Sequence, residues 1–322
     1  MSKEKVFPYE ECPEGFEGPI WRFSGNPVIK RHPTKKASRV FNSSVIQYGD
    51  GFIGIFRGDG NDDIPHLYVG CSKDGVNFDI SDKRIIFEDE KGNILPETGY
   101  QYDPRLIPLE DKYYIVWCDD FCGPAISIAY TTDFKKFIKF DYPFLPCNRN
   151  GVLFPRKING HYYMLSRPSD LGHTPFGDIF ISESDDLIHW GRHKLVARSG
   201  YEWWCALKIG PGPTPIEIED GWLLLTHGVN RTCNGYVYSI GGMILDKNDP
   251  SVVKYRCKDY LLTPEEDYET VGFVSNVIFP TSTIVDKESG RIAIYYGCAD
   301  TYTGLAFSTI DRLVKFIKEN AR

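Results

Sequence analysis

The hydrophobic pattern of this chain repeats one unit: a short strand, a tight polar turn, and a second strand rich in apolar or aromatic residues. Turns such as Gly-Asp-Gly, Asn-Gly and Asp-Gly between apolar runs are typical of β-hairpins. Five segments have the pattern: VIQYGDGFIGIF (45–56), LIPLEDKYYIVW (106–117), FPRKINGHYYML (154–165), PIEIEDGWLLLTH (215–227) and TIVDKESGRIAIYY (283–296). The sequence therefore predicts five hairpins.

A second pattern follows most of the hairpins. It consists of a short β run, a turn with Ser or Thr and Asp, and then an aromatic residue, and it occurs at 69–78, 128–137, 179–190 and 305–316. The segment after the fourth hairpin, 236–246, lacks the aromatic end. Five units in 322 residues leave about 64 residues for each. This predicts an all-β fold, a five-bladed β-propeller, and disfavours a β-sandwich, which rarely repeats in this way.

One stretch has the periodicity of a good helix. TIDRLVKFIKENAR places Ile310, Leu313, Val314 and Ile317 on one face. We expect a single propeller domain over 1–322, with a C-terminal helix at 310–322 that packs on the rim or on a neighbouring subunit. Residues 1–20 are expected to form an arm, over the surface or across to another subunit of a homo-oligomer.

Composition narrows the function classes. Aromatic residues make up 14% of the chain, which suits sugar binding, and the net charge of −7 argues against a nucleic-acid partner. No apolar run is long enough for a membrane span. Nine cysteines without a CxxC pair, and an N-terminus without an apolar signal core, predict a cytoplasmic protein with reduced cysteines.

The central channel of a propeller is the expected site, because the innermost strands can direct polar groups from every blade to one point. We therefore consider the polar residues near the ends of the predicted strands. They are Asn42, Ser43, Arg57 and Asp59 in the first unit, Asp103 in the second, Arg149, Asn150 and Arg167 in the third, Lys208 and His227 in the fourth, and Asp300 in the fifth.

Each of these residues also has a purely structural interpretation. Asp103, next to a proline, can cap a turn, Arg57 and Asp59 can form a structural ion pair, and His227 can be a hydrogen-bonded core histidine. The cations of the third and fourth units can be solvated surface charges. Two of those cations, however, follow the apolar runs YYML and EWWCAL. Convergence in one channel favours a functional interpretation of the set.

A single carboxylic acid that faces several cations indicates a particular chemistry. An inverting glycoside hydrolase needs two carboxylates, one acid and one base that activates water. Phosphate is already a nucleophilic anion, so an enzyme that uses it needs no such base. The sequence shows no spacing typical of zinc or calcium sites. We therefore expect no metal and no cofactor, with inorganic phosphate as the co-substrate.

The sequence resembles glycoside hydrolase family 130, the β-mannoside phosphorylases and related mannosidases. The resemblance extends from NPVIKR and FNSSVI to IAIYYGCADTYTGLAFSTID, and residues 148–184 are its most specific part. It implies a five-bladed propeller in which Asp103, within YDPR, is the catalytic acid. In such enzymes the proton is thought to travel through the mannose 3-hydroxyl, and phosphate attacks from the opposite face to give α-mannose 1-phosphate.

The resemblance also implies the binding residues. The phosphate-binding positions match Arg149, Arg167, Lys208 and His227, and hydrolytic members lack much of this set. The residues assigned to the mannoside are Asn42, Ser43, Arg57, Asp59, Tyr102, Asn150 and Asp300, with His173 near the acceptor sugar.

Several hypotheses about the reaction remain. The leading one is phosphorolysis of β-1,4-mannosyl-N-acetylglucosamine or short β-1,4-mannooligosaccharides. A β-1,2-mannobiose phosphorylase, a β-mannosidase and a non-catalytic sugar-binding propeller are the alternatives. Variation in the loop 200–206 is expected to affect the choice of acceptor.

Overall fold

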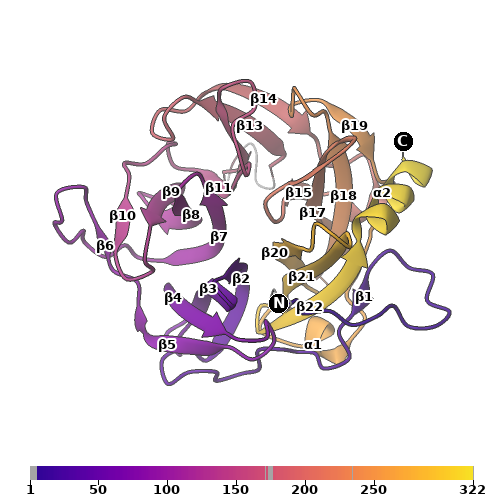
Figure 1. The fold of residues 1–322 in the computed structure, drawn as a ribbon, viewed down its shortest axis with the longest axis horizontal. Helices are drawn as coiled ribbons and strands as arrows, with labels where there is room; N and C mark the ends of the chain where they lie inside the picture. Colours follow the sequence, from indigo (N-terminus) through magenta and orange to yellow (C-terminus); the bar gives the residue numbers. More distant parts are fainter. Residues whose placement is uncertain (1–5, 171, 173–176, 234, 322) are drawn as a thin grey trace, which may run out of the picture.

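The computed structural model describes residues 6–170, 172, 177–233 and 235–321, and its strands form five sheets around a common centre (Figure 1). Nearly all neighbouring strands are antiparallel, and one edge strand of each sheet lies next to the centre. The fold is a five-bladed β-propeller, so the prediction from the repeated hairpins is confirmed.

The blades follow one another along the chain. Blade one contains β2 (Arg39–Tyr48), β3 (Gly51–Asp59), β4 (Pro65–Ser72) and β5 (Asp79–Arg84). Blade two contains β7 (Gln101–Leu109), β8 (Lys112–Asp120), β9 (Pro124–Thr131), β10 (Phe137–Lys139) and β6 (Phe87–Glu88). Blade three contains β11 (Asn148–Leu153), β12 (Tyr162–Pro168), β13 (Ile179–Ser184) and β14 (Gly191–Ala197). Blade four contains β15 (Lys208–Pro211), β16 (Ile216–Ile218), β17 (Gly221–Thr232), β18 (Gly235–Leu245) and β19 (Val253–Arg256). Blade five contains β20 (Ile278–Val285), β21 (Arg291–Cys298), β22 (Tyr302–Thr309) and β1 (Trp21–Arg22).

The N-terminal segment closes the ring. Strand β1 pairs with β22, with Trp21 opposite Phe307, so residues from both ends of the chain complete blade five. The described part of the preceding arm packs on the same blade, since the Tyr9 ring lies 5.8 Å from Trp21 and 5.4 Å from Phe307. The sequence pattern did not identify this strand, because two residues are too few to show an alternating period.

The second sequence pattern has a local physical cause. At the end of β9, the Thr131 hydroxyl accepts hydrogen bonds from the backbone N–H groups of Asp133 and Phe134, and Asp133 accepts two more from Lys135 and Lys136. Corresponding Ser and Asp bonds follow β4 and β13. Such side-chain bonds satisfy the turn backbone. They explain why this combination of residues recurs from blade to blade.

The C-terminal helix α2 (Ile310–Glu319) has the predicted amphipathic character. Thr309 caps it by accepting a bond of 3.2 Å from the backbone N–H of Arg312. Its apolar face buries Leu313 and Ile317 against the core between blades four and five. Two shorter helices, α1 (Asp267–Thr270) and the 3₁₀ turn η1 (Trp203–Cys205), were not predicted, since one turn shows no helical period.

The core holds the blades in a ring. The described buried apolar residues form five clusters, and each joins two neighbouring blades. The cluster between blades one and two, for example, contains Ile55 and Leu67 of blade one together with Phe87 and Trp117 of blade two, whose rings stack with centroids 4.5 Å apart. Burial of apolar groups such as these rings makes the main favourable contribution to the free energy of folding. No helix in the described ranges has the length and apolarity needed to cross a membrane.

Candidate active site

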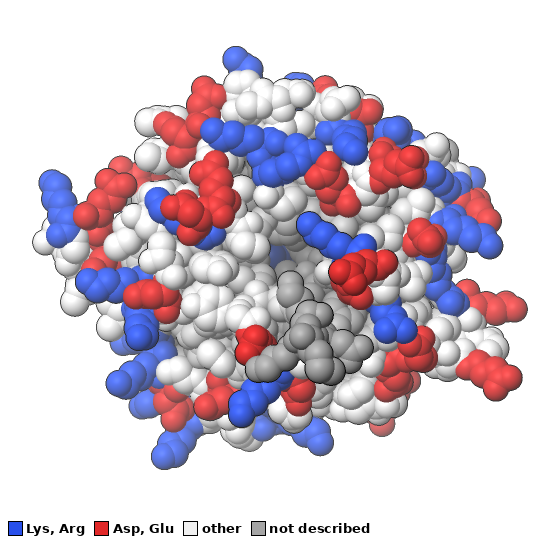
Figure 2. All heavy atoms as spheres, in the orientation of Figure 1, with Lys and Arg blue, Asp and Glu red and all other residues white. Residues whose placement is uncertain are grey.

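A cavity of about 270 Å³ lies where the five innermost strands meet. Figure 2 shows that this face of the molecule is hollowed at its centre, and that basic atoms lie within the hollow. All five blades contribute to the lining: Asn42, Arg57, Tyr102, Asp103, Arg149, Asn150, Arg167, Lys208, His227, Tyr238, Val274, Val277, Phe279 and Asp300.

Bulges in the innermost strands place three of these side chains. The pairing register shifts near the start of β2, β7 and β11, and at each shift one residue has a positive φ. These residues are Asn42 (47°), Asp103 (53°) and Asn150 (56°). Asn and Asp tolerate this left-handed conformation better than other residues with a side chain, and a bulge redirects the side chain it carries. The position of Asp103 beside Pro104 is therefore a bulge at the cavity wall.

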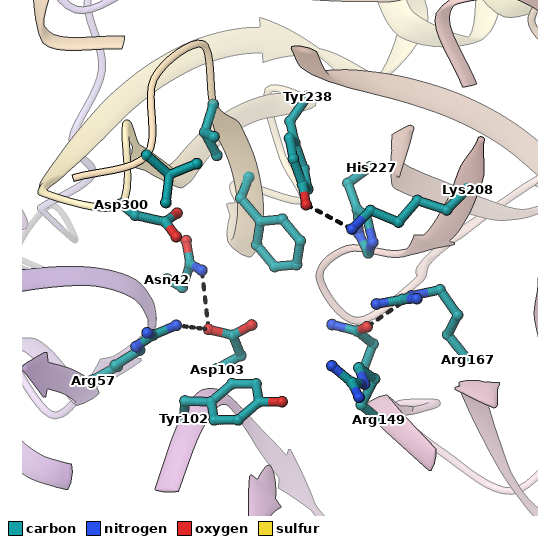
Figure 3. A pocket seen from close by; sticks show the side chains of 14 residues that line it. Asn42, Arg57, Tyr102, Asp103, Arg149, Arg167, Lys208, His227, Tyr238 and Asp300 are labelled. Atoms are coloured by element: carbon teal, nitrogen blue, oxygen red, sulfur yellow. Dashed lines mark hydrogen bonds and ion pairs between the residues drawn. The ribbon is translucent and has the colours of Figure 1, made fainter. Parts of the chain in front are cut away.

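Asp103 is held by two donors. Its Oδ1 accepts hydrogen bonds of 2.9 Å from Nδ2 of Asn42 and of 2.9 Å from Nη1 of Arg57. Arg57 is itself fixed by the buried Asp59, which accepts from Nε at 2.9 Å and from Nη2 at 3.1 Å. Burial lowers and these two carboxylates raise the pKa of Arg57, and the net change is upward, so it stays protonated. Figure 3 shows the second oxygen of Asp103 on the side of the basic residues opposite.

Two arginines of blade three stand side by side. Arg149 in β11 is paired directly with Arg167 in β12, and like charges at such a position are destabilising. Arg167 is buried and donates from Nε to Oδ1 of Asn150 at 3.1 Å. Burial and the charge of Arg149 lower the pKa of Arg167 to about 10. An anion between the two guanidinium groups would relieve their repulsion and accept charge-assisted hydrogen bonds.

Blade four adds two more basic side chains to this wall. Burial, together with Arg167 and Arg149, lowers the pKa of Lys208 to about 7, and its ammonium donates to Oη of Tyr238 at 2.6 Å. Burial and the neighbouring cations also place the pKa of His227 well below its usual value, so its ring is neutral. Within the described residues Nδ1 of His227 has no hydrogen-bond partner.

A glycine makes room for the histidine ring. Gly210 in β15 lies opposite His227 in β17. A Cβ at Gly210 would come within 2.3 Å of Cε1 and 2.5 Å of Nε2 of His227. The ring of His227 also packs against the ring of Phe279, with centroids 4.3 Å apart. The orientation of His227 therefore depends on a glycine at the paired position in β15, because any side chain there would collide with the ring.

Asp300 is a second carboxyl group in the cavity. Burial raises its pKa to about 6; Arg57 opposes this effect and Asp103 adds to it. Figure 3 shows Asp300 beside Asn42, on the same side of the cavity as Asp103 and away from Arg149 and Arg167. The two carboxyl groups therefore face the basic wall together.

The structure brings ten of the thirteen residues selected from the sequence to the cavity wall. Ser43 and Asp59 lie behind it: the Ser43 hydroxyl donates to the carbonyl of Phe41, and Asp59 supports Arg57. His173 lies outside the described residues. Loop 200–206 contributes none of the lining residues given above, and its Trp203 is 59% exposed.

Four lining residues were missed by the sequence analysis: Tyr238, Val274, Val277 and Phe279. The segment FPTS of blade five repeats FNSS of blade one, and the register shifts in both, so the repeat marks the strand that brings Phe279 to the cavity, although the corresponding Phe41 is not a lining residue. Tyr238 and the two valines carry no such signal. Among the described residues, no group of three or more His, Cys, Asp or Glu is placed to hold a metal ion.

Comparison with known proteins places this geometry in context. The family model described as beta-1,4-mannooligosaccharide phosphorylase, of glycoside hydrolase family 130, matches residues 1–319. A beta-1,4-mannooligosaccharide phosphorylase of Ruminococcus albus is 48% identical over 98% of this chain and 95% of its own. A 1,2-beta-oligomannan phosphorylase of a Thermoanaerobacter species is 32% identical over 88% of this chain and 95% of its own.

A solved structure has the same architecture. The beta-1,2-mannobiose phosphorylase of Listeria innocua, in complex with beta-1,2-mannobiose, superposes with a TM-score of 0.83 and 25% sequence identity. The superposition covers 93% of this chain and 99% of that one. The similarity thus extends over nearly the full length of both chains.

Proposed function

This chain belongs to glycoside hydrolase family 130 and is a glycoside phosphorylase, and we propose that it cleaves β-1,4-linked mannosides with inversion, transferring mannose to phosphate. The observation that carries the proposal is that the carboxyl group and the basic side chains lie on opposite sides of the cavity. Asp103 lies on one side, and Arg149, Arg167, Lys208 and His227 form the other. A sugar between them would have an acid on one face and an anion site on the opposite face.

The proposed reaction follows from this division. Asn42 and Arg57 hold one oxygen of Asp103, and the other oxygen delivers a proton toward the glycosidic oxygen through the mannose 3-hydroxyl. The glycosidic C–O bond breaks, and the acceptor sugar leaves with the proton. Phosphate, held by the basic wall, forms the new bond to the anomeric carbon from the opposite face. The product is α-mannose 1-phosphate.

The position of Asp300 supports phosphate over water as the nucleophile. An inverting hydrolase places its base across the sugar from its acid. Asp300 lies on the same side as Asp103 (Figure 3), and the opposite side carries Arg149 and Arg167. We assign Asp300 to the mannoside, together with Asn42, Arg57, Tyr102 and Asn150. Ser43 and Asp59 would act from behind the wall, and the contact of His173 with the acceptor stays a prediction.

The β-1,4 linkage and the self-association of the protein are further parts of the proposal. The linkage is supported by the Ruminococcus albus relative, whose identity of 48% exceeds the 32% of the 1,2-beta-oligomannan phosphorylase. A cytoplasmic location agrees with the nine free cysteines. Size-exclusion chromatography with light scattering would determine the number of subunits.

We expect activity to require phosphate. The enzyme is incubated with β-1,4-mannobiose, β-1,4-mannosyl-N-acetylglucosamine or β-1,2-mannobiose, with and without phosphate, and mannose 1-phosphate and free mannose are quantified. Mannose 1-phosphate should form from a β-1,4 substrate and only with phosphate. Equal release of free mannose in phosphate-free buffer would identify a mannosidase instead, and preference for the third substrate would refute the linkage.

The pKa of Lys208 predicts a pH effect on phosphate use. Below about pH 7 its ammonium is protonated and attracts phosphate, whereas above that pH the free enzyme loses the charge. The kcat/KM for phosphate should therefore fall as the pH rises through about 7, since this parameter reports groups of the free enzyme. In Lys208→Arg the charge persists, so the fall should move to higher pH. Identical pH profiles of the two proteins would contradict the role of Lys208.

A further inference from the structure

A fully buried arginine lies behind the cavity. Arg105 belongs to β7, immediately after the Asp103 bulge, and is 1% exposed. It is not among the residues that line the cavity. Its guanidinium carbon lies 5.6 Å from the ring centroid of Phe279, which forms part of the lining. A charge in such a place is costly unless hydrogen bonds compensate for the lost water.

The hydrogen bonds of Arg105 connect two blades that are not neighbours. Its Nη1 donates to the backbone carbonyl of Asp103 at 2.9 Å, on the bulge of blade two. Its Nε donates to the carbonyl of Gly212 at 2.8 Å, in blade four. Gly212 directly follows β15, the strand that contains Lys208 and Gly210. The Arg105 guanidinium therefore holds two backbone segments at once: the one that carries Asp103, and the one that carries Lys208.

The packing around Gly212 makes this connection stiff. Its N–H donates to the carbonyl of Leu225 at 2.9 Å, and a Cβ at Gly212 would lie 2.8 Å from that carbonyl oxygen and 3.0 Å from Cγ of Pro280. The Gly212 backbone is thus closely packed between β17 and β20. A carbonyl held in this way gives the guanidinium a fixed reference point on the far side of the cavity.

We propose that Arg105 is a positioning residue for phosphorolysis, which sets the separation between the Asp103 carboxyl group and the phosphate-binding wall. The inference rests on the proposed function. Acid and nucleophile act on opposite faces of one sugar, so their spacing must match the ring between them. A misplacement of about 1 Å can reduce a rate by roughly 10²-fold. The guanidinium fork suits this task because it directs several N–H groups in fixed directions.

The test compares Arg105→Lys and Arg105→Met in the full-length enzyme. Methionine keeps much of the volume but donates no hydrogen bond, and one lysine ammonium cannot reproduce the planar fork. We expect kcat to fall roughly 10- to 100-fold in Arg105→Met and less in Arg105→Lys. The KM for the mannoside should stay within about threefold, because other residues line the sugar site.

Chemical rescue and a matched control separate positioning from stability. Arg256 is also a largely buried arginine of blade four; it pairs with Glu202 and donates to the carbonyl of Arg198 at 2.7 Å, away from the cavity lining. Arg105→Ala and Arg256→Ala should both lower the Tm. Only Arg105→Ala should lose kcat, and only it should regain activity with millimolar guanidinium chloride.

The wild-type enzyme is assayed first, because absence of mannose 1-phosphate there would refute the proposed function itself. The positioning role is refuted if Arg105→Met retains wild-type kcat below its Tm, or if Arg256→Ala loses as much kcat as Arg105→Ala. If the methionine and alanine variants do not fold, Arg105→Lys decides. Wild-type kinetics of that variant refute the role, and a lower kcat with an unchanged mannoside KM supports it.

Discussion

Replacing Asp103 with asparagine is expected to reduce kcat by about 10²- to 10⁴-fold or more while the fold stays intact, because general acid catalysis contributes on that scale. The amide has nearly the same shape, and its oxygen can still accept from Asn42 and Arg57 as Oδ1 does. It has no acidic proton to deliver to a leaving oxygen. Steady-state kinetics, the Tm and mannoside binding by calorimetry measure the three properties separately.

A matched control is Asp220→Asn, which changes a partly exposed aspartate that pairs with Lys318 at 2.8 Å, away from the cavity lining. That variant should keep wild-type activity. Binding of the mannoside to Asp103→Asn should change far less than kcat, since most contacts come from other blades. Near-normal phosphorolysis by Asp103→Asn would mean that the carboxyl group only supports Arg57 and the bulge, and the proposed mechanism would be wrong.

Replacing Arg167 with alanine is expected to raise the apparent KM for phosphate roughly 10- to 100-fold, the factor that corresponds to about 1.5–3 kcal/mol for a hydrogen bond to a charged group. The guanidinium is buried directly beside Arg149, so its contact with an anion would be poorly screened by solvent. The KM for the mannoside should rise much less. Phosphate and mannoside are titrated separately, each with the other near saturation.

Two comparisons test whether the effect is specific. Arg156→Ala removes a half-exposed arginine that pairs with Glu217 at the surface and should leave both KM values unchanged. Binding of sulfate to Arg167→Ala, measured by calorimetry, should be weakened in parallel with the use of phosphate. If the KM values for phosphate and mannoside rise equally, Arg167 would instead support the site through Asn150, to which it donates.

The local chemistry of the chain explains how much of the fold was predictable. The five hairpins, the Ser and Asp turns and the face of α2 all depend on residues a few positions apart, so short-range periods and turn residues reveal them. The strand β1 does not, because Trp21 and Arg22 take their place only by pairing with β22, more than 280 residues later. The position of β1 in blade five is therefore determined by its pairing with β22, which closes the ring of blades.

The candidate site divides in the same way. The charged residues near strand ends, and the resemblance of the sequence, were sufficient to select Asp103, Arg149, Arg167, Lys208 and His227. The sequence by itself determined which chemical groups are present and in which blade each lies, because each blade is a local unit of the chain.

Only the tertiary structure decided how these groups act together. Three features depend on contacts between residues that are far apart in the sequence or lie on different strands. They are the pairing of Arg149 with Arg167, the pKa of Lys208 near 7, and the connection from Asp103 through Arg105 to Gly212. Those contacts are set by the packing of five blades into a closed ring, in which residues far apart in sequence share one desolvated cavity.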